Sequence, residues 1–567
     1  MTLAGWFEIA LTLALVLIAG YPIGAFMADI FENRRTFLTP IIGPVERGLY
    51  WAAGVDPEAE QKWFEYAISM VAFGGACMLS LYALLRLQAY LPLNPQGFPG
   101  VPPDLAFNIA ISFITNTNWQ AYAGETTLSH FSQMVGLTTN NFLDSAAATA
   151  IAVALTRAFT RRESPTIGNF WVDMTRATLY VFLPLSIIVA LLFAALGVPQ
   201  TLSASVVATT LEGAKQVMAL GPVASQEAIK LIGDNGGGFL NANSAHPFEN
   251  PSVWSNMLQN WSQLVLPMAL VFTFGRMIGD WRQGRTLLLA MAVIFVTALL
   301  VIYWSQSHGN PALTALGVDP SMGNMEGADL RFGQAGAALF IDATTGTGTG
   351  ASNSVLESAT PVTGLIAMFN LLLGCISPGG VGSGLYSLLL LTFIAAFLAA
   401  LMIGRTPEYL GKKISTRDMQ FAMFALLVSP VLLLGFAGAS TLLAVNSVGA
   451  GGPHGLSEIL YAYASTVSDN GSAFAGLSAN TPWYNVTTGL AMFFGRFAHA
   501  IPILAIAGSL AGKKRLSPSP GTLPTDGPLF IVFLLSVIIV ITLLQYLPAL
   551  ALGPFAEHFL LERGVMF

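Results

Sequence analysis

The chain has 567 residues, of which 54% are hydrophobic and only 10% are charged. Soluble globular domains carry roughly 25% charged residues, so the composition excludes an ordinary soluble protein and indicates a polytopic membrane protein. The net charge of −6 is too small to indicate a nucleic-acid partner.

Ten apolar segments are each long enough for a membrane-spanning helix, which needs roughly 20 residues. The first has no basic N-terminal region and no small-residue cleavage site, so we expect no cleavable signal peptide. The seventh is long and interrupted. We therefore predict an all-α polytopic fold with about ten transmembrane helices, near residues 4–27, 64–90, 128–156, 173–197, 253–276, 286–305, 358–403, 418–446, 484–511 and 528–549.

Lysine and arginine alternate between the two sides of this arrangement. The loops after the first, third, fifth, seventh and ninth predicted spans contain 18 of the 24 basic residues. The longer loops on the other side contain few. By the positive-inside rule the basic loops face the cytoplasm, so we expect both termini to face outward.

Four connections on the less basic side share one internal order. Each begins with a helix-like stretch too short to span the membrane, as in a re-entrant pore helix, and continues into a loop rich in Gly, Asn, Thr and Ser. Asn116, Asn235, Gly348 and Asn470 mark these loops at intervals of 119, 113 and 122 residues. Such regularity indicates structural repeats. The four sequences are LAFNIAISFI with TNTNWQ, VASQEAIKLI with GDNGGGF, FGQAGAALFIDA with TTGTGTGAS, and LSEILYAYASTV with SDNGSAF.

We therefore predict four parallel repeats around a pore axis along the membrane normal, each consisting of a span, a pore helix, a filter loop and a second span. One extra span lies outside the repeats at each end of the chain. The predicted segments are an N-terminal span with a cytoplasmic loop (1–63), repeat 1 (64–172), repeat 2 (173–285), repeat 3 (286–417), repeat 4 (418–526) and a C-terminal span (527–567).

The second loop, Ile232 to Pro251, contains three consecutive glycines. Alone, it is either a water-exposed hairpin or a re-entrant segment whose carbonyl groups face an ion, which glycine permits because it tolerates positive φ and has no Cβ. Its recurrence in four repeats favours the second interpretation. We expect Thr117, Gly236, Gly348 and Gly471 at equivalent positions.

Loops of this kind suit a weakly hydrated cation, because carbonyl and hydroxyl oxygens replace its water. The C-terminal ends of the pore helices would add partial negative charge. The absence of a dense carboxylate cluster in the loops argues against calcium or magnesium. The candidate filter residues are Asn116, Thr117, Asn118, Asn235, Gly236, Thr347, Gly348, Thr349, Gly350, Asn470 and Gly471.

Several ionisable residues lie in or beside the apolar segments, where a charge is costly. Asp234 and Asp469 flank two of the loops and either raise the local cation concentration or brace the backbone. Arg496 lies in the middle of the ninth span; it either pairs with carbonyl groups or a neighbouring acid, or forms a barrier below the filter, and the two roles are compatible. Asp144 is expected to make a structural contact. The histidines, including His454, show no spacing typical of metal ligands.

The sequence SPGGVGSG, residues 377–384, interrupts the seventh span. Proline and glycine inside a membrane helix are tolerated where neighbours or a cavity satisfy the freed backbone groups. The break falls on the cytoplasmic side of the third loop. Gly379, Gly380 and Gly382 are therefore candidates for a gate, with a packing kink as the alternative.

The chain contains no GxxxxGK[ST] phosphate loop and no aspartyl-phosphate signature. The GxG sequences in TTGTGTGAS lack the βαβ context of a dinucleotide site. We therefore expect no catalytic site in this chain, and no ATP hydrolysis without a partner.

Six sequences in order, TNTNWQAY, GDNGGGFLNANSAHPFENP, GGVGSGLY, GRTPEYLGKKI, DNGSAFAGLSANTP and GRFAHAIP, resemble the KdpA family, the potassium-binding subunits of bacterial Kdp potassium-importing P-type ATPases. The resemblance covers nearly the whole chain. It implies a channel-like subunit of the bacterial inner membrane, in complex with a P-type ATPase subunit (KdpB), with KdpC and with a single-span peptide (KdpF). It also implies that K⁺ is the transported ion, that ATP is bound only by KdpB, and that K⁺ passes from below the filter through an intramembrane tunnel into the pump.

Carried over by position, the resemblance places the filter, and hence the K⁺ ligands, at the candidate residues above together with Gly237 and Ser472. It places Gln120 directly behind the first loop. The third loop departs from the family pattern, which commonly has Ser-Cys-Gly where this chain has Gly348, Thr349 and Gly350. Because threonine retains an oxygen ligand, we expect selectivity for K⁺ to be preserved. The alternative function is an autonomous K⁺ or Na⁺ channel of the same superfamily, gated by a cytosolic partner. A secondary carrier would instead require inverted repeats.

Overall fold

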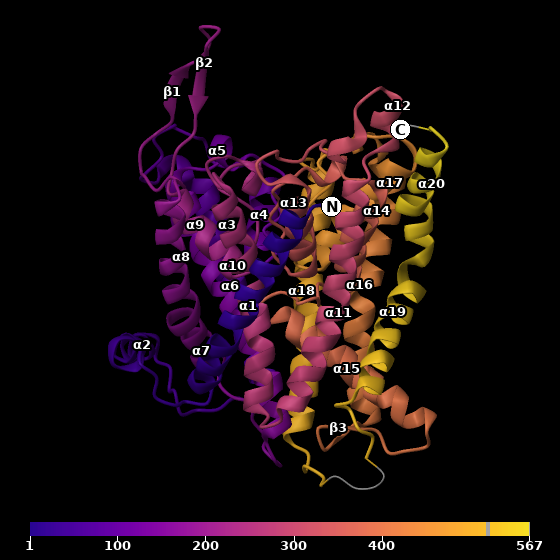
Figure 1. Ribbon diagram of the computed structural model, residues 1–567. Coiled ribbons are helices and arrows are strands. Elements are labelled where there is room, and N and C mark those ends of the chain that lie inside the picture. Colours follow the sequence, from indigo (N-terminus) through magenta and orange to yellow (C-terminus); the bar gives the residue numbers. More distant parts are fainter. Residues whose placement is uncertain (518–521, 566–567) are drawn as a thin grey trace.

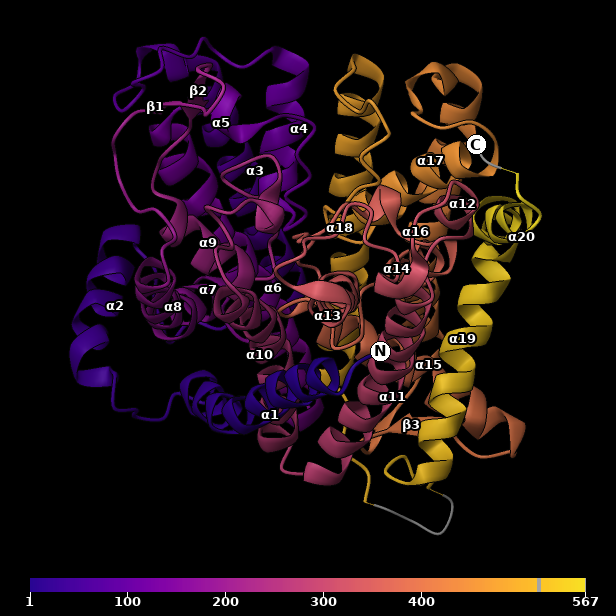
Figure 2. The ribbon, with the colours of Figure 1, turned by 45° about the horizontal axis from the view of Figure 1, so that its top comes forward.

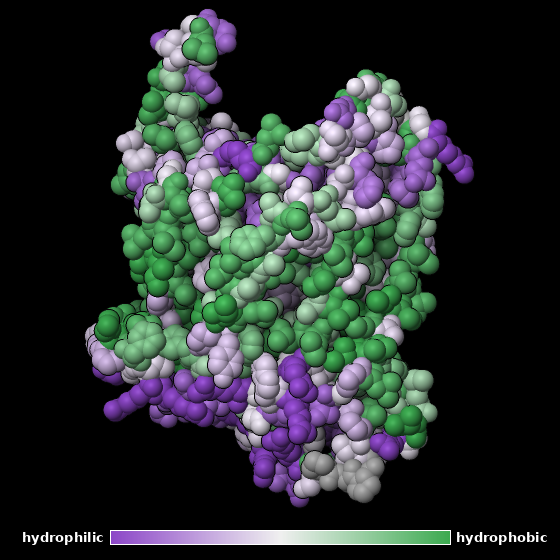
Figure 3. Space-filling view, in the orientation of Figure 1, coloured by the Kyte–Doolittle hydropathy of each residue, from purple (hydrophilic) through white to green (hydrophobic). Residues whose placement is uncertain are grey.

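The computed structural model describes residues 1–517 and 522–565, so residues 518–521 and 566–567 of the last two predicted segments lie outside the described residues. The described chain forms a bundle of long helices (Figure 1). Nine of the helices in these ranges are long and apolar enough to cross a membrane. On the face seen in Figure 3, a belt of hydrophobic side chains covers the middle of the bundle, and hydrophilic residues gather at its two ends. The chain is therefore an all-α polytopic membrane protein, as predicted.

Each predicted span corresponds to a helix or a pair of helices. The first six are α1 (Leu3–Phe31), α3 (Trp63–Leu87), α6 (Thr139–Thr160), the continuous pair α7 (Phe170–Arg176) and α8 (Leu183–Ala195), α10 (Val253–Met277) and α11 (Trp281–Ser307). The last four are α14 (Pro361–Leu372) with α15 (Ser383–Met402), α16 (Thr416–Leu443), α18 (Pro482–Ala511) and α19 (Pro528–Leu550). The seventh span is thus broken, as expected.

Helix α10 is the long helix that falls outside the nine apolar ones. Its polar side chains Asn256, Gln259 and Gln263 are fully buried, and Gln259 donates a hydrogen bond to the carbonyl oxygen of Glu249 at 2.9 Å. Helix α1 lies alongside α10, where the hydroxyl of Thr273 donates to the carbonyl oxygen of Gly24 at 3.0 Å. A polar helix is thus kept inside the bundle and covered by the first apolar one.

The four predicted pore helices are all present, as α4 (Pro103–Ile114), α9 (Val223–Ile232), α13 (Gly333–Gly346) and α17 (Gly452–Val467). Each packs between the two spans that flank it in sequence: α3 and α6, α8 and α10, α11 and α14, and α16 and α18. We call each set of span, pore helix and span a unit. Helix α18 also packs against α3, α4 and α6, so the fourth unit meets the first. Figure 2 shows α1 to α10 on one side of the bundle and α11 to α19 on the other.

Several elements were not predicted. The amphipathic helix α2 (Thr39–Ala53) lies beside one end of the bundle, and a hairpin of β1 (Val206–Thr209) and β2 (Lys215–Met218) projects from the opposite end (Figure 1). We call the end with the hairpin the vestibule end and the other the basic end. The remaining short elements are α5 (Gly124–Thr127), α12 (Pro311–Ala315), α20 (Ala556–Glu562), β3 (Glu408–Tyr409) and β4 (Lys412–Lys413). Both strand pairs are antiparallel.

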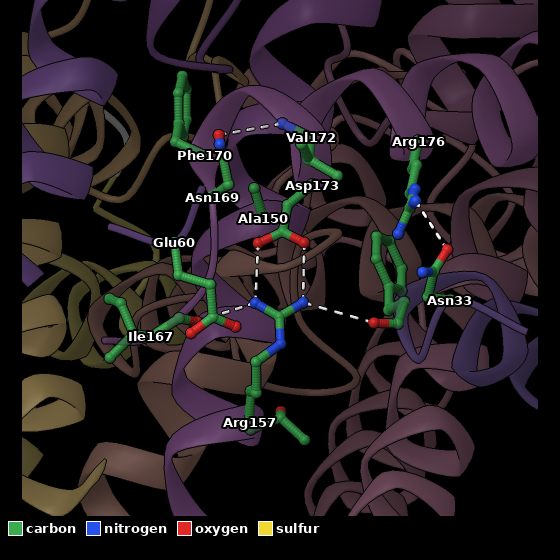
Figure 4. A network of polar contacts seen from close by, with 12 residues as sticks. Asn33, Glu60, Ala150, Arg157, Ile167, Asn169, Phe170, Val172, Asp173 and Arg176 are labelled. Atoms are coloured by element: carbon green, nitrogen blue, oxygen red, sulfur yellow. Dashed lines mark hydrogen bonds and ion pairs between the residues drawn. The ribbon is translucent and has the colours of Figure 1, made fainter. Parts of the chain in front are cut away.

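A part-buried ion pair fixes the junction between α6 and α7 at the basic end (Figure 4). The guanidinium of Arg157 makes two hydrogen bonds, of 2.8 and 3.0 Å, to the two carboxylate oxygens of Asp173. Tyr66 of α3 donates its hydroxyl to the same carboxylate at 3.1 Å. Such bidentate pairs restrict geometry more tightly than a single contact, so three helices are held together where the first and second units meet.

Candidate functional site

Each pore helix ends in a loop, and each of the four loops has a residue of positive φ where it contacts a neighbouring loop. These residues are Asn118 (48°), Gly236 (70°), Gly350 (69°) and Gly471 (94°). Glycine adopts this conformation without steric cost, and asparagine is the ordinary residue that tolerates it best. The four positions therefore share one local geometry.

The second, third and fourth loops contact one another through their backbones. Gly236 lies against the carbonyl oxygen of Thr349, and Gly350 lies against that of Asn470. A Cβ on either glycine would overlap the oxygen. The approach of one loop to the next thus depends on the missing side chain.

The contacts continue until the ring of loops is closed. Gly471 lies in the same way against the carbonyl oxygen of Thr117 in the first loop. Between the first and second loops the side chain of Asn118 takes over, and its amide donates to the carbonyl oxygen of Gly236 at 2.9 Å. Each of the four loops therefore touches its two neighbours.

The register of the loops differs from the expected one. We expected Thr117, Gly236, Gly348 and Gly471 at equivalent positions. In the structure, the residues equivalent to Gly236 are instead Asn118 in the first loop and Gly350 in the third. The N–H group of each of these three residues donates to the carbonyl oxygen of the residue six positions earlier. The three N···O distances are 3.2, 3.5 and 3.1 Å. One sequence feature could have identified the equivalent position: each of these residues directly follows a threonine or an asparagine.

The first two loops are braced from behind by amide side chains. Gln120 accepts from the N–H of Gly238 at 2.9 Å and donates to the carbonyl oxygen of the same residue at 3.1 Å, so it links the first loop to the second. The Asn235 amide donates to Asn116 and, at 2.9 Å, to the carboxylate of Asp144 on α6. Asp144 thus makes the structural contact that we expected.

Asp234 connects the second loop to the third. Its carboxylate accepts a hydrogen bond from the Thr349 hydroxyl at 3.1 Å, and that hydroxyl lies 2.6 Å from the hydroxyl of Thr347. All three side chains are fully buried. The Thr349 side chain is therefore engaged behind the loop, and the oxygen that it contributes at the ring contact is its backbone carbonyl. The Asp234 side chain thus joins the second loop to the third by a hydrogen bond.

Asp469 and Arg496 form a buried ion pair beneath the fourth loop. The guanidinium Nη1 of Arg496 lies 3.0 Å from a carboxylate oxygen of Asp469 and 3.4 Å from the hydroxyl of Tyr386. The exposed fractions of the two charged side chains are 5% and 11%. Arg496 thus pairs with a neighbouring acid, one of the expected alternatives, and its positive charge lies directly behind the fourth loop.

The break in the seventh span lies under the third loop. The carbonyl oxygen of Gly346, at the end of α13, accepts hydrogen bonds from the N–H groups of Ser377 and Gly379, both at 3.1 Å. A Cβ on Gly380 would lie 3.3 Å from the backbone nitrogen of Gly348. Two backbone N–H groups of the break are thus satisfied by the pore helix, in keeping with what a membrane interior requires.

The same segment reaches the opposite side of the ring. Gly382, with φ of 89°, lies so close to Ala148 of α6 that a Cβ would overlap the backbone there. Helix α6 belongs to the first unit, whereas the break belongs to the third. The segment therefore passes below the loops from one unit to the one across from it.

A cavity of about 770 Å³ opens at the vestibule end above the loops. Residues from all four loops line it, including Asn118, Gly237, Gly350 and Gly471. Ser472 also lines this cavity, and its hydroxyl donates a hydrogen bond to the side-chain oxygen of Asn470 at 2.5 Å. The ring of loops is thus open to a wide vestibule.

A buried charge cluster that was not predicted from the sequence lies behind the second loop. Lys230 of α9 lies 2.7 Å from carboxylate oxygens of both Glu227 and Glu249, with no more than 1% of any of the three side chains exposed. Glu249 also accepts from the N–H of Leu240 at 2.7 Å. The signal was a lysine and a glutamate three residues apart in the short helix α9.

Comparison with known proteins gives consistent results. The profile of the family described as KdpA, potassium-transporting ATPase A subunit, matches residues 10–559. Proteins described as potassium-transporting ATPase potassium-binding subunits are 56% identical in Allorhizobium ampelinum and 52% identical in Granulibacter bethesdensis, over 100% of both chains. The corresponding protein of Beijerinckia indica subsp. indica is 54% identical over 99% of both chains.

A solved structure shares the fold at low sequence identity. The crystal structure of the potassium transporter TrkH from Vibrio parahaemolyticus aligns with a TM-score of 0.51 and 15% identity, over 88% of this chain and 97% of that one. At this identity the alignment shows a common fold. The family profile matches nearly the whole chain and the relatives named above are 52–56% identical to it, so the chain belongs to the KdpA family of potassium-transporting ATPase A subunits.

Proposed function

We propose that this chain is the potassium-binding and translocating subunit of an ATP-driven K⁺ import complex. The names of its relatives supply the class of function. The observation that carries the proposal is the closed ring of four loops, in which carbonyl oxygens of the first, third and fourth loops lie against positive-φ glycines of their neighbours. Such a ring offers an ion several fixed oxygen dipoles in place of its hydration shell.

In this proposal K⁺ enters from the vestibule and loses its water among backbone carbonyl groups of the four loops. The loops present neutral dipoles to the ion. Asp234 acts from behind by holding Thr349, and Asp469 by pairing with Arg496. A filter of this kind discriminates by the number and spacing of its oxygens. The hydrogen bonds of Gln120, Asn118 and Asp234 hold that spacing across loop boundaries.

We propose that the break in the seventh span and Arg496 together prevent free flow of K⁺ to the basic end. The break contacts both Gly348 and Ala148, on opposite sides of the ring. A buried guanidinium repels a cation through a medium of low dielectric. In this barrier, the backbone of the break packs closely against its surroundings at three glycines, Gly379, Gly380 and Gly382.

A blocked axial path requires a lateral exit, and we propose that K⁺ leaves through an intramembrane tunnel toward a P-type ATPase subunit. A cavity of about 80 Å³ between α15, α16, α18 and α19 is lined by Asp469, Ser383, Tyr386 and His499, and it supports this route because it begins beside the fourth loop. KdpB would hydrolyse ATP, with KdpC and KdpF as the further partners and no catalytic site in this chain.

The proposal includes the arrangement of the chain in a bacterial inner membrane. The basic end would face the cytoplasm and the vestibule end the periplasm, with both termini outside. The four repeats at 64–172, 173–285, 286–417 and 418–526 would be the units of the filter, with 1–63 and 527–567 as flanking segments. Their common packing of span, pore helix and span supports this division.

The test is K⁺-stimulated ATP hydrolysis by the affinity-purified complex, with Na⁺ as the competing ion. We expect stimulation by K⁺, little response to Na⁺, and co-purification of an ATPase subunit. Ion conduction by the isolated chain at channel rates would instead support the alternative, an autonomous channel gated by a cytosolic partner. Purification without any ATPase subunit would also contradict the import complex.

A further inference from the structure

Four ionisable side chains meet at the vestibule end, away from the filter. They are Glu357, which follows the third loop, His454 and Glu458 of α17, and Glu557 of α20. The Nε2 atom of His454 lies 2.8 Å from a carboxylate oxygen of Glu357, and its Nδ1 atom lies 2.9 Å from one of Glu557. Segments far apart in sequence are thus brought to one imidazole ring.

Three of these side chains have the arrangement of metal ligands. One ligand atom each from Glu357, His454 and Glu458 lies within 4.8 Å of the other two. His454 and Glu458 are four residues apart on one helix and so share a face. The ligands of a tetrahedral zinc ion at roughly 2.0 Å are about 3.3 Å apart, so small rotations of the three side chains would accommodate a metal and leave a fourth position for water.

The second nitrogen of His454 strengthens this interpretation. A metal-binding histidine typically gives its other ring N–H to a carboxylate, which fixes the tautomer and raises the basicity of the ligand. Glu557 occupies that position toward Nδ1. A proton held on Nδ1 by Glu557 would leave Nε2, the nitrogen that faces Glu357, free to bind a metal.

The local charge also favours a cation. Three carboxylates surround a single imidazole, and no lysine or arginine forms an ion pair with any of them among residues 1–517 and 522–565. Glu458 accepts instead from the N–H groups of Gly449 and Ala450, both at 2.8 Å. Part-buried negative charge of this kind is stabilised by pairing or by a metal ion.

We propose that Glu357, His454 and Glu458 form a binding site for a divalent transition metal of the zinc class, with Glu557 orienting His454. An imidazole ligand favours zinc over calcium and magnesium, which prefer oxygen ligands alone. Glu357 also accepts from the N–H of Gly476 at 3.1 Å, next to the vestibule wall at Ala475. A bound metal would therefore connect α20 to that wall.

The test measures metal binding on the intact purified complex without a polyhistidine tag, after treatment with EDTA. Zinc chloride is titrated by calorimetry, and the bound zinc is counted by mass spectrometry after desalting. We expect one zinc per chain in the wild type and none in His454→Gln. Glu557→Gln should retain the site with an affinity about 10- to 100-fold weaker.

His558→Gln is the matched control, because His558 lies on the same helix α20 and pairs only with Glu562 of that helix among the described ion pairs. It should bind zinc as the wild type does. The proposal is overturned if the wild type retains no zinc, or if His454→Gln retains as much as the wild type. Should His454→Gln fail to fold, Co²⁺ absorption of the wild type and Glu557→Gln decides: an intense tetrahedral band in the wild type supports the site and a weak octahedral one refutes it. K⁺-stimulated ATPase activity, measured on the same samples, tests the import function separately.

Discussion

The carbonyl oxygen of Thr349 lies so close to the Cα of Gly236 that no β-carbon fits between them. This contact joins the second loop to the third through backbone atoms alone. The spacing of the oxygens around the ring therefore depends on a glycine whose role is to be small and to adopt positive φ.

The first prediction concerns that glycine. Gly236→Ala should lower the apparent K⁺ affinity of the complex at least about tenfold, which corresponds to about 1.4 kcal/mol, because the added methyl group displaces the third loop. K⁺-stimulated ATP hydrolysis over a range of K⁺ concentrations measures the change. Gly54→Ala is the control, since Gly54 has a similar φ of 65° and nothing within 4 Å of its missing Cβ. An equal effect of both variants would show that backbone conformation, and not the loop contact, is responsible.

The second prediction concerns the hydroxyl of Thr349. Thr349→Val removes the hydrogen bond to Asp234 and leaves a buried carboxylate with one partner fewer, at a cost of about 1–3 kcal/mol. We expect the apparent K⁺ affinity to fall by about tenfold, whereas Thr349→Ser, which keeps the hydroxyl, should stay near the wild type. If Thr349→Val and Thr349→Ser have the same apparent K⁺ affinity, the hydroxyl does not brace the filter.

The pore helices could be predicted from sequence, but the register of their loops could not. Short apolar stretches followed by Gly, Asn and Thr recur at regular intervals, and this pattern correctly identified α4, α9, α13 and α17. The equivalence of Asn118 with Gly236 depends on dihedral angles and on contacts between loops about 118 residues apart. Counting residues from aligned asparagines cannot reveal either.

Helix α10 illustrates a second limit. Asn256, Gln259 and Gln263 lower its hydropathy, and only the packing of α1 and other helices around it explains how such a helix lies within the bundle. The partners of Arg496 and Glu357 are likewise distant in sequence. A sequence locates a costly charge, but the tertiary structure decides which group neutralises it.

The third prediction separates two roles of Arg496. Removing either member of a buried ion pair costs about 3–5 kcal/mol, so Arg496→Gln and Asp469→Asn should both lower the thermal stability of the complex. If Arg496 is also a barrier, only Arg496→Gln should increase the passive leak of Rb⁺ from proteoliposomes without ATP. Asp469→Asn keeps the positive charge and tolerates the positive φ of 55° at that position. Equal leaks in the two variants would leave Arg496 with a structural role alone.

The fourth prediction concerns pH in the metal-free complex. Burial alone lowers the pKa of His454, but its hydrogen bonds to Glu357 and Glu557 and the charges of these groups outweigh that effect and raise the pKa to about 10. A raised pKa means that the protonated histidine stabilises the fold fully below its ordinary pKa of about 6.5, and that this stabilisation is lost as the pH rises through 10. In EDTA, the wild type should therefore unfold at a higher temperature than His454→Gln at pH 6.5, and the difference should shrink toward pH 10.5. A difference that does not change with pH would exclude the ion pairs as its source.

The fifth prediction uses two glycines of the same broken span. Gly382 and Gly374 have similar φ values of 89° and 84°, but Gly382 lies against the backbone of Ala148, whereas nothing lies within 4 Å of the missing Cβ of Gly374. Alanine at either position carries the cost of the left-handed conformation, roughly 1–2 kcal/mol. Only Gly382→Ala also pushes the break away from α6, so we expect it to raise the passive Rb⁺ leak and to lower the number of ions transported per ATP. Gly374→Ala should lower stability without a leak. A leak of the same size in both variants would mean that the contact between Gly382 and α6 is not what closes the axial path.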